Sequence, residues 1–324
     1  MSEPALLVTG AAGHLGRRVL EILLDVPGPR TLIATTRQPA KLAELAARGV
    51  DVRAADFDDE AGLAAAFAGA GRALVISTDV IDGSGRRVAQ HAAAIRALGR
   101  AGVQHVVYTS LVDAPTVGPI ASDHRATEAA LQESDLDFTV LRNNLYAELV
   151  LAAVPAALAT GELVDARGDG AVAWISRDDC ARVAAAMLLE AALGRRLVQV
   201  AGPVAYTSGD VAATLAELSG RPIAHRAVTP DARKAGLIAA GLPARAVEVY
   251  TAFDAAIAAG ELARTSTAGE RLTGTAGGWT RAPRPGTTGR RGRSRCCTAR
   301  CSGRGAAATP RRSRWPPAPP WATR

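Results

Sequence analysis

The sequence predicts an α/β fold in which a doubly wound parallel sheet precedes a smaller, mostly helical C-terminal lobe. Its first half alternates short, β-branched apolar runs with longer alanine-rich stretches, a pattern typical of strands joined by crossover helices. The first apolar run leads directly into a glycine-rich turn and a helical stretch. Apolar periodicity continues to Gly274 and then stops. These features predict a Rossmann domain at 1–150, the smaller lobe at 151–274 and a tail at 275–324.

Six strands are predicted from the apolar runs, at 5–9, 31–36, 50–54, 73–77, 105–109 and 138–141. The stretches between them have helical periodicity and are long enough for right-handed crossovers, at about 14–24, 39–48, 60–68, 86–101 and 123–134. A short apolar run at 197–200 and amphipathic stretches at 209–218, 232–240 and 244–259 follow. We expect these later segments to form the lobe over the carboxyl ends of the strands, where a substrate would be enclosed.

The tail differs in composition from the rest of the chain. It has 12 Arg, no acidic residue, and no Leu, Ile, Val, Phe or Met. Residues 1–274 keep 26 of the 38 basic residues and all 31 acidic residues, so the net charge of +7 becomes −5 without the tail. A segment of this kind buries too little apolar surface to fold, so we expect disorder. Its composition is typical of a GC-rich gene read out of frame, which is the interpretation we favour.

Two functional interpretations of the tail compete with that one. An arginine-rich arm would bind RNA or a membrane, and a cluster of Cys296, Cys297 and Cys301 would bind a metal, although it lacks a CxxC spacing. The rest of the chain contains only Cys180, which fits a reducing compartment. With no export signal and no membrane-length apolar run, the sequence predicts a cytoplasmic monomer or homodimer without specific nucleic-acid or membrane partners.

The glycine-rich turn predicts a dinucleotide site. Gly10, Gly13 and Gly16 form the motif TGAAGHLG at the first strand–helix junction. The first glycine would permit a tight turn, the second a close approach of the backbone to a diphosphate, and the third close packing of helix on strand. A merely structural turn is the alternative. The residues assigned to the cofactor in this loop are Gly10, Ala12, Gly13, His14, Leu15 and Gly16.

The end of the second strand indicates which dinucleotide binds. An acidic residue there would hold an unmodified ribose, but none lies between Asp25 and Glu44. Arg37 follows the strand, and Lys41 lies one helical turn later, so both could contact a 2′-phosphate. The sequence therefore favours NADPH over NADH. A solvated surface arginine is the alternative for Arg37.

Residues after the next strands complete the predicted cofactor site. Asp56 and Phe57 follow the third strand and would border the adenine. Ser77 and Thr78 follow the fourth and would pass beside the nicotinamide ribose. Tyr108 and Thr109 end the fifth strand and are assigned to the same site. Each of these residues could instead be ordinary loop structure.

The usual acid–base pair of short-chain dehydrogenases is missing. That pair is a Tyr with a Lys four residues later, and neither Lys41 nor Lys234, the only lysines, follows a Tyr at this spacing. His124 and Glu128 lie one turn apart in the helix where the pair would be. His124 could donate a proton while Glu128 fixes its tautomer. A partly exposed His beside a solvated Glu is an equally good interpretation.

Three more side chains are predicted at the substrate mouth, at the carboxyl ends of strands. Tyr108 and Tyr146 could stack on a flat aromatic substrate, or they could pack against the smaller lobe. Asn143 could hydrogen-bond the nicotinamide carboxamide or a substrate oxygen. The predicted catalytic set consists of His124, Asn143 and Tyr146. No metal ligand is predicted.

The motifs TGAAGHLG, TTRQPAK, AGVQHVVYTS, DHRATE and LRNNLY together resemble those of the NmrA-like atypical short-chain dehydrogenase/reductase family. Within it, the sequence is most similar to the type 2 NAD(P)H:quinone oxidoreductases and triphenylmethane-dye reductases. The resemblance covers about residues 4–274. It implies two-electron reduction of a quinone or conjugated dye by direct hydride transfer from NADPH, without metal or flavin. An NmrA-type NADP(H) sensor without turnover is the alternative.

Overall fold

The structure, a computed structural model, describes residues 4–190 and 194–273, which belong to one unit. Its centre is a seven-stranded parallel sheet in the order β3-β2-β1-β4-β5-β6-β9. The strands are β1 (Ala5–Val8), β2 (Leu32–Thr36), β3 (Asp51–Ala54), β4 (Ala70–Val75), β5 (His105–Leu111), β6 (Asp137–Asn143) and β9 (Arg195–Val200). The order reverses between β1 and β4, so the predicted doubly wound Rossmann sheet is confirmed.

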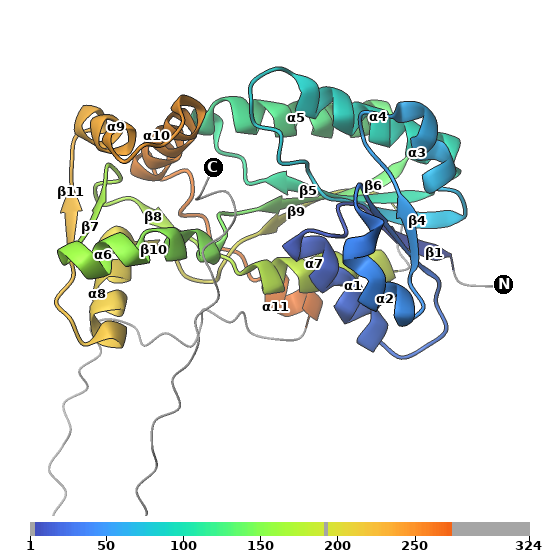
Figure 1. Cartoon of the computed structure of the whole chain (residues 1–324), viewed down its shortest axis with the longest axis horizontal. Helices are drawn as coiled ribbons and strands as arrows, with labels where there is room; N and C mark the ends of the chain where they lie inside the picture. Colours follow the sequence, from blue (N-terminus) through green and yellow to red (C-terminus); the bar gives the residue numbers. More distant parts are fainter. Residues whose placement is uncertain (1–3, 191–193, 274–324) are drawn as a thin grey trace, which may run out of the picture. The chain divides into compact units, whose positions relative to one another are not determined.

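Helices cover both faces of this sheet (Figure 1). On one face lie α1 (His14–Asp25), α2 (Ala43–Ala47), α7 (Arg177–Leu189) and α11 (Ala268–Thr273). On the other lie α3 (Glu60–Ala66), α4 (Arg86–Arg100) and α5 (Pro119–Glu133). Alternate strand residues enter the two cores, as when Val107 packs on the α1 side and Val106 on the α4 side. Burial on both faces explains the nearly continuous apolar runs.

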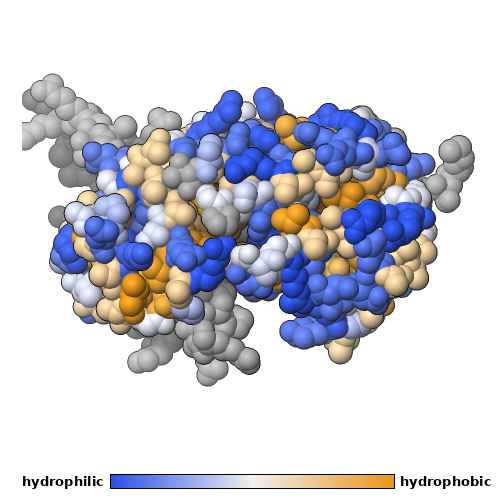
Figure 2. All heavy atoms as spheres, turned by 90° about the horizontal axis from the view of Figure 1, so that it is seen from above, coloured by the Kyte–Doolittle hydropathy of each residue, from blue (hydrophilic) through white to orange (hydrophobic). Residues whose placement is uncertain are grey.

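The remaining elements form the predicted smaller lobe. Its helices are α6 (Val154–Thr160), α8 (Ser208–Ser219), α9 (Pro230–Ala239) and α10 (Ala244–Ala258). Strand β7 (Glu162–Asp165) pairs parallel with β11 (Ala224–Ala227), and β8 (Ala171–Val172) pairs antiparallel with β10 (Tyr206–Thr207). Short 3-10 helices η1 (Pro39–Leu42), η2 (Pro115–Val117) and η3 (Ala147–Ala152) complete the described structure. On the face seen in Figure 2, exposed apolar residues form small groups among polar ones.

Two sequence-based expectations about elements are wrong. The run 197–200 was expected in the smaller lobe, but it belongs to β9, which pairs with β6 as a seventh sheet strand. Four apolar residues do not predict which strand they pair with, because that strand is distant in the sequence and the long-range pairing decides which sheet they join. The predicted helix 39–48 is divided into η1 and α2. The tail assigned to 275–324 lies outside the described residues.

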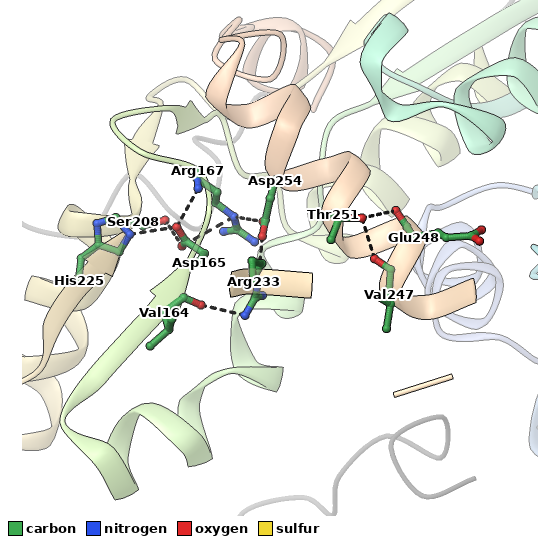
Figure 3. A network of polar contacts seen from close by, with 10 residues as sticks. All are labelled: Val164, Asp165, Arg167, Ser208, His225, Arg233, Val247, Glu248, Thr251 and Asp254. Atoms are coloured by element: carbon green, nitrogen blue, oxygen red, sulfur yellow. Dashed lines mark hydrogen bonds and ion pairs between the residues drawn. The ribbon is translucent and has the colours of Figure 1, made fainter. Parts of the chain in front are cut away.

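A buried ionic network holds the smaller lobe together (Figure 3). Asp254 of α10 is 1% exposed, and its two carboxylate oxygens accept hydrogen bonds from Arg167 at 2.7 Å and Arg233 at 3.0 Å. Asp165 at the end of β7 accepts from Ser208 at 2.6 Å and from His225 at 3.0 Å. These bonds tie α10, α9, α8, β7 and β11 to one another. Because every charge has a partner, the ion pairs and hydrogen bonds offset much of the desolvation penalty of burying the network.

Candidate functional site

The loop between β1 and α1 has the geometry of a dinucleotide cradle. Gly10 adopts a φ of +59°, which a side chain would strain. The Gly13 N–H donates to the Gly10 carbonyl at 3.0 Å. A Cβ on Gly16 would lie 2.7 Å from the Gly10 oxygen and 2.8 Å from the Ala11 Cα, so only glycine fits there. The tight turn and the close packing expected from the motif are therefore both present.

The first turn of α1 is suited to an anion. Its N-cap residue Gly13 provides no side-chain hydrogen bond, and the turn contains no acidic residue. Two other helices have ordinary caps, since Ser176 accepts from the Asp179 amide and Thr207 from the Asp210 amide. An uncapped helix N-terminus beside glycines leaves backbone N–H groups for a ligand's phosphates. This local geometry fits a dinucleotide diphosphate.

Arg37 and Lys41 follow β2, and Arg17 of α1 reaches the same segment while it also pairs with Glu44 at 3.4 Å. Arg37 is exposed, and it has no ion pair within 4.0 Å among the residues that the structure describes. The Arg17 guanidinium donates to the Lys41 carbonyl at 2.6 Å, which places it beside the segment containing Arg37 and Lys41. Arg17 was not predicted from the sequence. The sequence did contain a signal for a basic residue near the cofactor, because Arg17 lies four residues after Gly13 in the first turn of α1.

The ends of β4 and β5 are joined by hydrogen bonds. The Ser77 N–H donates to Thr109 Oγ1 at 2.9 Å, and the Thr78 N–H donates to His91 Nε2 at 3.0 Å. After β3, Asp56 and Phe57 are half-buried, and the Asp56 carboxylate accepts from the Asp58 amide. Ser77, Thr78 and Thr109 are therefore brought together at the carboxyl edge of the sheet. Their contact with a cofactor stays a prediction.

Tyr108 is placed differently from the expected stacking surface. Its side chain is 0% exposed and packs in the core between the sheet and α4. Its hydroxyl lies 2.8 Å from His124 Nδ1 and 3.4 Å from His91 Nδ1. Stacking of Tyr108 on a substrate is therefore wrong for this structure, and packing explains the residue. An aromatic residue in a strand does not reveal by itself which face it occupies.

The partners of the two buried imidazoles fix their tautomers. The Thr78 amide can only donate, so His91 Nε2 accepts and its Nδ1–H donates to Thr127 Oγ1 at 2.9 Å. The Arg87 guanidinium also only donates, so His124 Nε2 accepts at 2.9 Å and its Nδ1–H donates to the Tyr108 hydroxyl. Both rings are therefore neutral, and both nitrogens of His124 are engaged.

Glu128 does not fix the tautomer of His124, and that expectation is wrong. Its carboxylate accepts from Ser110 Oγ at 2.6 Å and from Arg142 at 2.7 Å. Arg87, which lies far from both residues in the sequence, takes the role instead. Same-face spacing in a helix permits a contact without requiring it. A small surface hollow here is lined by Leu111, Val112, Asp113, Ala121, His124, Arg125, Glu128 and Arg142.

Because His91 and His124 are buried as neutral rings, we expect the free energy of unfolding to depend on pH. Burial, followed by the charge of Arg87, lowers the pKa of His91 to about 3. Burial, followed by the charge of Arg87, also lowers the pKa of His124 well below its usual value. Unfolded imidazoles bind protons near pH 6.5. Because the folded rings do not, unfolding takes up protons below that pH, and the folded state loses stability as the pH falls from about 6.5 towards 3.

We expect His91→Gln to remove part of this slope. Between pH 6.5 and 5, wild type should lose about 1.6 kcal/mol more of its free energy of unfolding than the variant, because the unfolded ring is half protonated at pH 6.5 and almost fully protonated at pH 5. Urea unfolding at these two pH values measures the difference. Equal losses in the two proteins would show that His91 is not buried as a neutral ring.

Asn143 is the last residue of β6, and Tyr146 follows three residues later. Asn143 is buried and its side-chain oxygen has no hydrogen-bond partner among the described residues, whereas Tyr146 is half-buried. Burial raises the pKa of Tyr146, so this hydroxyl stays protonated. The Arg177 guanidinium lies 4.9 Å from the Tyr146 ring centroid. The unpartnered Asn143 oxygen is thus an available acceptor, and Arg177 is a neighbour of Tyr146 that was not predicted from the sequence.

The described residues contain no group of three His, Cys, Asp or Glu side chains that could hold a metal ion. The cysteines of the tail lie outside this part of the chain. Over the same residues, none of the helices is both long and apolar enough to cross a membrane.

A Rossmann sheet with a glycine cradle, an uncapped α1 and cations after β2 defines a dinucleotide-binding protein. A family of NAD(P)H-binding proteins matches residues 10–191, and the chain belongs to it. The chain is 36% identical over 269 residues to quinone oxidoreductase 2 of Escherichia coli, which covers 82% of this chain and 93% of that protein. It is 31% identical over 240 residues to an NAD(P)H azoreductase of Xenophilus azovorans, covering 74% and 82%.

Solved structures show the same relationship. The E. coli NADPH-dependent quinone oxidoreductase QOR2 complexed with NADPH superposes with a TM-score of 0.80 at 35% identity, covering 84% of this chain and 95% of that one. The triphenylmethane reductase of Citrobacter sp. gives a TM-score of 0.78 at 33% identity with the same coverage. The regulator NmrA, at 14% identity and a TM-score of 0.62, shares the fold alone. The resemblance expected from the sequence motifs is confirmed.

Proposed function

We propose that this protein is an NADPH-dependent reductase that transfers two electrons, as a hydride, to quinones or similar conjugated aromatic acceptors. The observation that carries this proposal is the similarity along 93% of E. coli quinone oxidoreductase 2, which includes the whole candidate site. The triphenylmethane reductase and the azoreductase among the similar proteins support a flat, conjugated acceptor. Both also favour an enzyme over the alternative of a sensor without turnover.

The loop and α1 would hold the cofactor diphosphate. The residues assigned to this contact are Gly10, Ala12, Gly13, His14, Leu15 and Gly16, whose backbone surrounds the uncapped helix N-terminus. Arg37 would bind the 2′-phosphate in bidentate fashion, with Arg17 and Lys41 beside it. Asp56 and Phe57 would border the adenine. Bound NADPH supplies the hydride, and this chain supplies the position in which it is presented.

Three neighbouring groups would orient the nicotinamide and the acceptor. The unpartnered Asn143 oxygen would accept a hydrogen bond from the carboxamide, which satisfies a buried polar atom. Ser77, Thr78 and Thr109, which are held by hydrogen bonds from Ser77 to Thr109 and from Thr78 to His91, would lie beside the nicotinamide ribose. Tyr146, which is half-buried and held by Arg177, would flank the ring of the acceptor. Holding the nicotinamide ring against the ring of the acceptor would account for most of the catalysis.

Direct protonation by a side chain plays a minor part in this proposal. The Tyr/Lys pair is absent, and both nitrogens of His124 already have partners. An electron-poor quinone needs little help to accept a hydride, and water can protonate the product. His124 is then a positioning residue, in place of the acid expected from the sequence. The reducing chemistry and the free, buried thiol of Cys180 fit a cytoplasmic site of action.

NADPH oxidation at 340 nm tests the proposal. The purified chain would be assayed with benzoquinones, naphthoquinones and a triphenylmethane dye, with NADH in parallel. Turnover with a preference for NADPH is the expected result. Tight NADPH binding without turnover of any acceptor would support the sensor and contradict the reductase.

A further inference from the structure

Arg87 is a buried cation that the reaction described above does not use. It lies in the first turn of α4, directly after the loop that follows β4 at the carboxyl edge of the sheet. Only 6% of it is exposed, whereas its sequence neighbour Arg86 is exposed and pairs with Asp58. Buried arginines are rare unless a partner compensates their desolvation. The partner of Arg87 is therefore informative.

The structure gives Arg87 a neutral partner only. One guanidinium nitrogen donates to His124 Nε2 at 2.9 Å, and the Nε–H has no hydrogen-bond partner. Among the described residues, no carboxylate lies within 4.0 Å of this guanidinium. Its pKa is lowered by burial, which is the effect of a charge without a counter-ion. The site therefore contains a desolvated positive charge and a free donor.

Arg87 lies near the carboxyl edge of the sheet. Its partner His124 lines the surface hollow together with Glu128 of α5 and Arg142 of β6. The loop between β4 and α4 contains the pair Ser77–Thr78 expected beside the nicotinamide ribose, and this loop leads directly into Arg87. The hydrogen bond to His124 fixes the orientation of the guanidinium. An anion arriving at this position would complete its hydrogen bonding.

We propose that Arg87 pairs with the acceptor oxygen that becomes negatively charged on reduction. This inference rests on the proposed function and names its preferred substrates as acceptors whose reduction yields an oxyanion. The C4–H bond of NADPH breaks, and the hydride forms an O–H bond at one quinone oxygen while the π electrons shift through the ring and leave the negative charge on the opposite oxygen. NADPH leaves as NADP⁺, the oxyanion pairs with Arg87, and a proton from water then gives the neutral hydroquinone.

A cationic triphenylmethane dye offers a natural comparison. Its central carbon accepts the hydride and its positive charge disappears, so reduction produces a neutral molecule and no oxyanion. A positive charge at the mouth gives such an acceptor no advantage. The two acceptors therefore respond differently to the loss of Arg87 if the charge acts on the product oxygen, and equally if Arg87 only supports the fold.

The test compares wild type, Arg87→Met, Arg87→Lys and the control Arg96→Met, which changes an exposed arginine of the same helix. Each is assayed with NADPH against 1,4-naphthoquinone and malachite green. We expect Arg87→Met to lower kcat/KM for the quinone by about 10- to 100-fold, the effect of one charge-assisted hydrogen bond, and to leave that for the dye nearly unchanged. Arg87→Lys should recover part of the quinone activity, and Arg96→Met should match wild type.

A binding measurement provides a readout that does not depend on turnover. Titration of the NADP⁺-saturated proteins with 2-hydroxy-1,4-naphthoquinone, an anion at neutral pH, should give a Kd that is 10- to 100-fold higher for Arg87→Met. Equal losses with both acceptors, or an unchanged Kd, would overturn the role of Arg87. Absence of wild-type turnover with every acceptor would instead refute the proposed function, so the two failures are distinguishable. Thermal unfolding shows whether Arg87→Met is folded, and Arg87→Lys keeps the test decisive if it is not.

Discussion

The Gly16→Val variant is expected to bind NADPH at least about 100-fold more weakly than wild type. A side chain at this position would overlap the Gly10 carbonyl and the Ala11 Cα, which are backbone atoms and cannot move without the loop. Displacing that loop moves the backbone amides away from the diphosphate. Misplacement by about 1 Å commonly costs about 100-fold. Titration of the purified variant with NADPH, followed by nicotinamide fluorescence, measures the loss.

Gly99→Ala provides the matched control. Gly99 lies inside α4, and a Cβ there would meet no atom within 4 Å. Alanine should bind NADPH normally and stabilise the helix by up to about 1 kcal/mol. If Gly16→Val bound NADPH as well as this control does, the β1–α1 loop would not be the diphosphate site. Circular dichroism of both variants shows whether each remains folded.

Arg37→Ala is expected to remove the preference for NADPH. The loss of a bidentate contact with the 2′-phosphate should raise KM for NADPH by about 10- to 100-fold. KM for NADH should stay nearly the same, because NADH has no phosphate at that position. Steady-state kinetics with both cofactors and one naphthoquinone give the two values directly.

Arg48→Ala is the control for general effects of charge. Arg48 is also exposed, follows α2 and pairs with Asp25 on the surface. Its loss should change neither KM. A parallel rise in KM for NADPH and NADH in Arg37→Ala would mean that Arg37 supports the loop structure rather than reading the phosphate. An unchanged preference would assign the phosphate to Arg17 and Lys41.

The local part of the fold was predictable because it depends on short-range patterns. Six of the sheet strands, the five crossover stretches and the glycine turn all have signals within about twenty residues. The seventh strand was misplaced because its register with β6 depends on a partner more than fifty residues away. The tight turn at Gly10 and the close approach at Gly16 followed from motif chemistry.

The buried part of the site was not predictable in the same way. His124 and Glu128 share a helix face, yet the structure pairs the first with Arg87 and Tyr108 and the second with Arg142. These contacts join α5 to α4, β5 and β6, so they depend on how the elements pack. Arg87 stands beside Arg86 in the sequence, and nothing local distinguishes the buried residue from the exposed one. Hydrogen-bond geometry was needed to assign the tautomer of His124.

Direct hydride transfer is the central claim, and isotope transfer tests it most directly. NADPH deuterated at C4, prepared separately as each of its two stereoisomers, would be used to reduce malachite green with the purified protein. The account predicts that one stereoisomer places deuterium on the central carbon of the reduced dye, detected by mass spectrometry, and that the other does not. A reduced dye without deuterium from either stereoisomer would contradict direct transfer, since the hydrogen would then have come from solvent or an intermediate carrier.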